Sequence, residues 1–205
     1  MSQPARWSGE TAVERGISTM GVLVVPTLET DRLRLRTFRP SDVEAYAALN
    51  ADPEVLRHLG SGPSWDEGRS WRHMAFLLGH WQLRGAGMWA VEHRESGAFI
   101  GVAGFAAPAG WPGFELAGAL ARPWWGQGYA TECGREALAY AFIVLAKEHV
   151  ISLIHPENRA SIRVAERIGE RLEGRIDHLG REMLVYGLDR ETYLMQTGLM
   201  RRPDL

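Results

Sequence analysis

The decapeptide at residues 122–131, which reads RPWWGQGYAT, constrains the fold of this chain more than any other stretch. Residues 114–120 before it form a short apolar run typical of a buried strand. Apolar residues after it recur at the spacing of an amphipathic helix, namely Ala130, Cys133, Ala137, Leu138, Ala141, Phe142 and Leu145. The sequence therefore predicts a strand that passes through a glycine-bearing turn into a helix.

Such a turn is a candidate anion site. Glycine adopts backbone angles that are closed to other residues, and it lets a ligand approach the main chain. The first N–H groups of the following helix have no internal acceptor and lie at the positive end of its dipole. Phosphate is the natural ligand of this arrangement. A tight strand-to-helix turn without any ligand is the alternative.

Three kinds of glycine loop bind phosphates, and they differ in their fixed residues. The nucleoside-triphosphate loop ends in Gly-Lys-Ser/Thr, and this segment has no lysine. The dinucleotide fingerprint G-x-G-x-x-G matches residues 126–131 except for its last glycine, but it should open an early strand–helix unit rather than lie past the middle of the chain. The third kind is a pyrophosphate loop of the form Gln/Arg-x-x-Gly-x-Gly/Ala.

Composition excludes several classes of protein. The 205 residues suffice for one domain with its own core, and a formal net charge of −2 gives no general attraction to nucleic acid or to an anionic membrane. No apolar run reaches the roughly 18 residues of a membrane span. The single Cys133 allows no internal disulfide, which favours a cytoplasmic location. Eight tryptophans suggest large flat contacts and make a homodimer a reasonable expectation.

Periodicity and turn residues divide the chain as follows. Residues 1–28 read as an N-terminal extension, either flexible or contributing an edge strand at residues 22–25. The strict alternation of residues 30–36 predicts a first strand with its leucines buried and its arginines in water. Ser41 with Glu44, and Ser64 with Glu67, predict capping boxes that open two helices, the second with Trp71, Met74, Ala75, Leu78 and Trp81 on one side. Further strands are expected at residues 88–92, 99–105, 149–154, 171–177 and 183–188, with a short helix at 158–168.

Residues 123–132, PWWGQGYATE, strongly resemble the acetyl-coenzyme A loop of the GNAT superfamily of N-acetyltransferases, and most closely its RimJ/RimL branch. Residues 30–55 are similar to the usual opening of that branch, and the resemblance covers roughly residues 28–195. It implies an α/β (α+β) fold for residues 29–205, a single acetyltransferase domain. The expected sheet is mixed, mostly antiparallel and six- to seven-stranded, flanked by helices and splayed centrally to hold acetyl-coenzyme A.

The resemblance also implies the cofactor-binding residues. Backbone amides from Trp125 to Thr131 would hold the phosphates, Leu120 and Ala121 would pair with the pantetheine amides, and Asn158 and Ser161 match the second family motif, N-x-x-S. The cofactor set is therefore Leu120, Ala121, Trp125, Gly126, Gln127, Gly128, Tyr129, Ala130, Thr131, Asn158 and Ser161. Trp125 stands where the family more often has Arg or Gln, a departure of small consequence because backbone amides do the binding.

Glu115 and Ser161 are the catalytic candidates. Glu115 is the only acid in its apolar strand, and burial would raise its pKa toward that of a useful base. A structural acid paired with an arginine is an equal alternative. Many family members carry a proton-donating Tyr seven residues after the motif Asn, but here that position is Ala165, which leaves Ser161 as the donor. The alternative for the motif is ordinary helix capping by Asn158.

The histidines are scattered and form no H-x-x-x-H or H-E-x-x-H pair, so we expect no metal site. His155, which ends a strand that should border the cleft, is a second candidate base, although a capped or solvated role is the more common one for a histidine before proline.

The sequence thus predicts acetyl transfer from acetyl-coenzyme A to a primary amine, on a protein N-terminus or a small molecule, by direct attack in a ternary complex. Two alternatives stay open: an acetyl-coenzyme A-binding module without turnover, and a dinucleotide-dependent oxidoreductase. Nothing in the sequence distinguishes one amine acceptor from another.

Overall fold

A single eight-stranded sheet organises the computed structural model, which describes residues 24–59 and 64–200. The strand order is β1-β2-β3-β4-β5-β6-β8-β7, and every neighbouring pair is antiparallel except β5–β6. The strands are β1 (Leu28–Glu29), β2 (Leu33–Arg36), β3 (Met88–His93), β4 (Phe99–Ala106), β5 (Glu115–Leu120), β6 (His149–Ile154), β7 (Arg171–His178) and β8 (Arg181–Asp189). The predicted mixed, mostly antiparallel sheet is confirmed.

The short edge strand β1 lies later in the chain than the edge strand that the sequence predicted. Residues 22 and 23 of the expected strand lie outside the described residues, and Val24 and Val25 carry no strand pairing. The chain joins the sheet at β1 instead, where Leu28 pairs with Leu35. The N–H of Trp89's indole donates to the carbonyl oxygen of Pro26 at 2.8 Å and fixes the approach to this strand.

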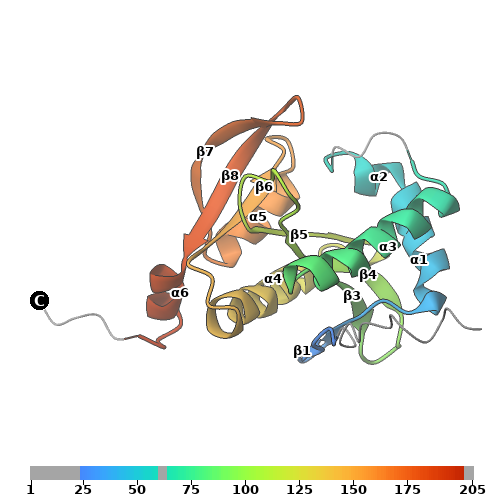
Figure 1. The fold of residues 1–205 in the computed structure, drawn as a ribbon, viewed down its shortest axis with the longest axis horizontal. Helices are drawn as coiled ribbons and strands as arrows, with labels where there is room; N and C mark the ends of the chain where they lie inside the picture. Colours follow the sequence, from blue (N-terminus) through green and yellow to red (C-terminus); the bar gives the residue numbers. More distant parts are fainter. Residues whose placement is uncertain (1–23, 60–63, 201–205) are drawn as a thin grey trace, which may run out of the picture.

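Helices cover both faces of the sheet (Figure 1). They are α1 (Val43–Ala51), α2 (Pro53–Leu56), α3 (Glu67–Arg84), α4 (Tyr129–Ala139, continued by a π-helix at Tyr140–Val144), α5 (Arg159–Arg167) and α6 (Arg190–Gln196), with 3₁₀ turns at Pro40–Asp42 and Arg122–Trp124. Trp89 and Val91 of β3 pack in one core with α4, whereas Ala90 between them packs with α1 and α3. Among the described helices, none is long and apolar enough to cross a membrane.

The two helix starts differ from the predicted capping boxes. Helix α3 is capped by Asp66, whose carboxylate accepts the N–H of Arg69 at 2.6 Å, rather than by Ser64. At α1, Pro40 opens a 3₁₀ turn before Ser41, and Asp42 accepts the N–H of Arg39 at 2.7 Å. At α3 a carboxylate replaces the expected hydroxyl, and its charge also interacts favourably with the positive end of the helix. At α1 the carboxylate of Asp42 bonds back to Arg39 and caps no N–H of the helix itself.

The buried faces of two helices are rotated from the predicted ones. Trp71 of α3 is 58% exposed, and the residues that turn inward are Ser70, Met74, Leu77, His80 and Trp81. Ala130 of α4 is exposed, and Tyr129 takes its place in the core, followed by Cys133 and Ala137 as predicted. An apolar stripe wide enough for a helix allows more than one orientation, and packing against the sheet selects one of them.

Arg36 is buried, although the alternation of its strand predicted an exposed side chain. Its guanidinium donates to both carboxylate oxygens of Asp42, at 2.7 and 2.8 Å, and to Glu92 at 2.6 Å. Arg34 and Arg39 also donate to Glu92, at 2.8 and 3.0 Å. The network joins β2, β3 and the start of α1, and it satisfies a charge that could not otherwise be buried.

We expect Asp42→Ala to lower the free energy of unfolding by about 3 kcal/mol, because it removes the bidentate partner of a buried guanidinium. Asp66→Ala is the matched control, since it removes an exposed helix cap and should cost only about 1 kcal/mol. Urea denaturation at neutral pH measures both. Equal losses in the two variants would contradict the importance of the buried network.

Candidate functional site

Strands β5 and β6 part almost as soon as they meet. Their parallel ladder consists of one registered pair, Glu115 with Ile151. On its other side β5 pairs with β4 over its full length, so alternate backbone groups of β5 point into the gap. Gly118, in the middle of that stretch, is exposed. The predicted central splay is therefore present, and it presents a strand edge to an incoming ligand.

Leu120 and Ala121 differ in what they offer at this edge. The N–H of Ala121 donates to Ile100 at 2.8 Å, and its carbonyl accepts the N–H of Trp124 at 2.9 Å, so Ala121 cannot donate to a ligand in the gap. Leu120 has the opposite orientation, and its carbonyl accepts the indole N–H of Trp125 at 2.6 Å. The expectation for Ala121 therefore needs correction, because its N–H faces β4.

The glycine loop has the geometry that the sequence predicted. Gly126 and Gly128 have φ angles of 75° and 86°, a region that favours glycine, and Gly128 is the N-cap of α4. Residues 129–131 form the first turn, whose N–H groups have no acceptor within a helix. The N–H of Trp125, by contrast, donates to Arg122 at 3.1 Å. Trp125 therefore contributes its indole to the loop, and its amide is already bonded.

Arg32, which lies between β1 and β2, binds this loop. The sequence did not predict this contact. The guanidinium of Arg32 donates to the carbonyl of Gln127 at 3.0 Å and to Glu132 at 2.7 Å, and it lies 4.4 Å from the ring centroid of Tyr129. Burial alone would raise the pKa of Glu132, but hydrogen bonds from Thr30 and Arg32 outweigh it and hold that pKa below its usual value. The carboxylate is thus neutralised beside the helix N-terminus.

Glu115 lies at the point where the strands part, and it is 7% exposed. Burial raises the pKa of its carboxyl to about 7, against the hydrogen bonds from the Trp111 indole and the Leu153 backbone. The indole N–H of Trp111 donates to Oε2 at 2.6 Å. The expected alternative, an ion pair with arginine, is not formed by any described residue. Glu115 therefore has the protonation behaviour of a base that works near neutral pH.

A second buried carboxyl, Glu170, lies close to the same gap. It is 2% exposed, and burial raises its pKa to about 7, with the charges of Glu173 and Glu115 adding to the effect. The hydroxyl of Ser152 lies 3.0 Å from Oε1 of Glu170 and 3.0 Å from the carbonyl of Leu116. Because a hydroxyl has one proton to donate, both contacts are satisfied when neutral Glu170 donates to Ser152.

Asn158 caps α5, and its side-chain oxygen accepts the N–H of Ser161 at 3.1 Å. This is the ordinary structural role, and it leaves the amide nitrogen of Asn158 and the half-buried hydroxyl of Ser161 for other partners. Ala165 is buried in a small core with Ile154 and Ile162. The position that holds a proton-donating Tyr in many relatives is therefore core in this fold.

The histidines are less scattered in space than in sequence. The rings of His58 and His155 stack with their centroids 5.3 Å apart, and Glu157 lies beside them. The N–H of Glu157 donates to Nδ1 of His155 at 3.2 Å, which gives that histidine the capped role expected of it. His58 follows α2, almost a hundred residues away, so no local motif could have predicted this cluster.

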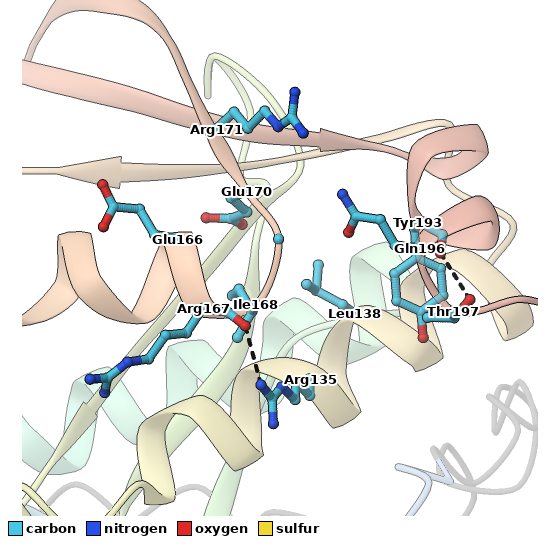
Figure 2. A pocket seen from close by; sticks show the side chains of 11 residues that line it. Arg135, Leu138, Glu166, Arg167, Ile168, Glu170, Arg171, Tyr193, Gln196 and Thr197 are labelled. Carbon is cyan, nitrogen blue, oxygen red and sulfur yellow. Dashed lines mark hydrogen bonds between the residues drawn. The ribbon is translucent and has the colours of Figure 1, made fainter.

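A cavity of about 530 Å³ has Glu170 in its lining. Figure 2 shows it between α4, the segment from α5 to β7, and α6. The side-chain amide of Gln196 lies close to Gly169. Arg135 donates to the carbonyl of Arg167 at 3.3 Å along the floor of the cavity. The lining of the cavity includes none of the predicted cofactor residues, so we assign it no part in the candidate site.

Comparison with known proteins agrees with this geometry. The family profile described as "Acetyltransferase (GNAT) domain" matches residues 32–171. The uncharacterised protein YkkB of Bacillus subtilis is 31% identical over 174 residues, which cover 81% of this chain and 96% of that protein. An acetyltransferase structure from Agrobacterium tumefaciens is 33% identical, with a TM-score of 0.72 over 80% of this chain and 94% of that one.

A third comparison concerns the fold alone. The ribosomal L7/L12 acetyltransferase RimL, solved in complex with coenzyme A, is 20% identical and has a TM-score of 0.69 over 80% of this chain and 98% of its own. The dinucleotide-dependent alternative loses its basis, because that fold needs a mostly parallel sheet and this one is mostly antiparallel. The chain belongs to the GNAT family of acetyltransferases, in its RimJ/RimL-type group, and the cofactor of this family is acetyl-coenzyme A.

Proposed function

We propose that this protein transfers an acetyl group from acetyl-coenzyme A to a primary amine by direct attack in a ternary complex. The observation that carries the proposal is the position of Glu115, a carboxyl with a pKa of about 7 at the point where β5 and β6 part. The strand that carries it leads directly into the glycine loop. One strand therefore connects a base for the amine to a site for the phosphates of the donor.

The residues present fit acetyl-coenzyme A. Gly126 to Thr131 would hold its phosphates, because both glycines have positive φ and a Cβ at Gly128 would approach only the flexible end of Arg32, at 3.5 Å. The N–H of Leu120 and the exposed backbone of Gly118 would pair with the pantetheine arm, in place of Ala121. The amide nitrogen of Asn158, which donates to none of the described residues, would bind the same arm. Acetyl-coenzyme A supplies the acetyl group as a thioester.

Two residues would then move protons. Glu115 takes a proton from the ammonium form of the acceptor, directly or through one water, so that the nitrogen can attack the carbonyl carbon. Ser161 would donate a proton to the sulfur when the carbon–sulfur bond breaks, and it would be reprotonated by the proton that the attacking nitrogen loses as it becomes the amide. A serine hydroxyl is a weak acid, so this role depends on its position in the first turn of α5 rather than on its pKa. Holding both substrates together supplies much of the remaining acceleration.

The acceptor amine is left open by the comparisons. RimL acts on a ribosomal protein, and a spermidine N-acetyltransferase of Vibrio cholerae was solved with spermine, but both are 20% identical or less and share only the fold. A binding module without turnover is the second candidate function. It would bind acetyl-coenzyme A with the same loop but would acetylate no amine.

Gly128→Val should weaken acetyl-coenzyme A binding at least about 100-fold, since a branched side chain is strained at φ 86° and blocks approach to the loop amides. Gly180→Val is the matched control, because Gly180 has a similar φ of 76° in the turn between β7 and β8. Calorimetric titration measures both. If the wild-type protein does not bind, or if the two variants are weakened equally, the loop is not the cofactor site.

Arg32→Ala should weaken acetyl-coenzyme A binding about tenfold, or roughly 1.4 kcal/mol, because Glu132 then faces the phosphates unneutralised and the Gln127 carbonyl loses its donor. Arg32→Lys should restore part of the loss. The control is Arg34→Ala, two residues further along in β2, which removes ion pairs to Glu29 and Glu92 but no loop contact. Equal effects from the two alanine variants would mean that Arg32 has only a structural role.

Glu115→Gln should lower kcat by about 10²- to 10⁴-fold without weakening acetyl-coenzyme A binding. The wild-type rate should rise with pH and level off above the pKa of about 7, whereas the variant should lack this step. Release of coenzyme A thiol is followed with peptides bearing a free N-terminus and with small primary amines. Binding without turnover on any amine would favour the binding module.

Stability gives an independent check on the same carboxyl. The folded pKa of about 7 lies above the value of 4.5 for a free glutamate, so the neutral form is favoured by folding. The stability that the neutral carboxyl contributes to the wild-type protein should be fully present below pH 4.5. It should be lost as the pH rises through 7. Glu115→Gln should therefore be as stable as wild type at pH 4.5 and more stable at pH 8. A variant that is less stable at both would be misfolded rather than catalytically impaired.

A further inference from the structure

His58, His155 and Glu157 come from two separate parts of the chain and meet at one point. His58 follows the last turn of α2, and the other two lie in the segment between β6 and α5. Each offers one ligand atom, and these atoms all lie within 4.8 Å of one another. The two imidazole rings are stacked, and their planes differ by 25°.

The donor set is selective. Two imidazoles and one carboxylate suit Zn²⁺ and neighbouring transition metals, whereas Mg²⁺ and Ca²⁺ prefer oxygen ligands alone. A metal at about 2.0 to 2.2 Å from each ligand requires them to approach one another by an ångström or so, which rotation of half-exposed side chains allows. Nδ1 of His155 already accepts a long hydrogen bond of 3.2 Å, so its lone pair is available in place of that contact.

We propose that His58, His155 and Glu157 bind a divalent transition metal ion of the zinc class, which links α2 to the segment between β6 and α5. Arg57 and Arg181 lie near enough to act electrostatically on His58, and they oppose a cation. Arg57 is partly neutralised by Glu54, to which it donates at 2.5 Å. We expect an affinity on the order of micromolar, with water completing the coordination.

A metal ion at this position would also affect the fold. The segment that it would bind leads directly into Asn158 and Ser161 at the start of α5, and its other ligand comes from the helical layer that includes α1 and α3. A bound ion would therefore fix the distance between these two parts, which otherwise meet through the stacked rings. The inference does not rest on the proposed function, because it needs only these three side chains.

The test uses the full chain without a polyhistidine tag, treated with a chelator and titrated calorimetrically with ZnCl₂. Wild type should bind one equivalent. His58→Ala and His155→Ala should each weaken binding at least tenfold, and Glu157→Gln about threefold or more. The matched control is His149→Gln, since His149 lies 2.8 Å from Glu173 and 4.0 Å from Asp189 but belongs to no such cluster. It should bind as wild type does.

A spectroscopic measurement identifies the ligands independently. Co²⁺ in place of Zn²⁺ should give visible absorption bands of a low-symmetry nitrogen and oxygen site, and both histidine variants should lose them. Circular dichroism confirms that each variant is folded. The proposal is overturned if wild type shows no binding up to about 1 mM Zn²⁺, if either histidine variant binds as tightly as wild type, or if His149→Gln weakens binding to the same extent.

Discussion

The separation of β5 from β6 after a single pair is the constraint on which the rest of this structure depends. A central strand that lacks a neighbour leaves backbone N–H and C=O groups without partners, at a cost that must be met locally. Ser152 bonds the carbonyl of Leu116, and the Trp125 indole bonds that of Leu120. Side chains therefore close the two ends of the exposed edge. The stretch between them is left for a ligand, which explains why a gap in the sheet can persist.

The glycine loop depends on residues far from it in sequence. Thr30 and Arg32 stand at the entry to the sheet, and both bind Glu132, one turn into α4. An acid in the first turn is favourable for a helix but unfavourable beside a phosphate. The guanidinium of Arg32 meets both requirements, because it neutralises Glu132 and also donates to the carbonyl of Gln127. The short β1–β2 segment thus belongs to the site as much as to the fold.

The sequence predicted the features whose causes are local. The strand, the two glycines and the helix of residues 115–139 follow from periodicity and from backbone angles that glycine favours, and the buried acid at Glu115 follows from one charge in an apolar strand. The sequence failed to predict the features that depend on residues far apart in the chain. Arg36 turns inward because Glu92 and Asp42 receive it, and His58 reaches His155 only in the folded chain. The predicted cap of α3 was wrong because Asp66 lies two residues after Ser64 and takes its place, and that of α1 was wrong because Pro40 opens a 3₁₀ turn before Ser41.

The two buried carboxyls show how one physical effect serves two roles. Burial raises the pKa of Glu115 and of Glu170 to about 7, yet their partners differ. Glu115 accepts from an indole and so can exist as a carboxylate with a donor in place. Glu170 is bonded to a hydroxyl that must itself donate to a backbone carbonyl, and this arrangement favours the neutral acid. The charge of Glu115 also helps to raise the pKa of Glu170, which further favours the neutral form of Glu170. Glu170 would then be a structural acid, and Glu115 would carry the single charge at the gap.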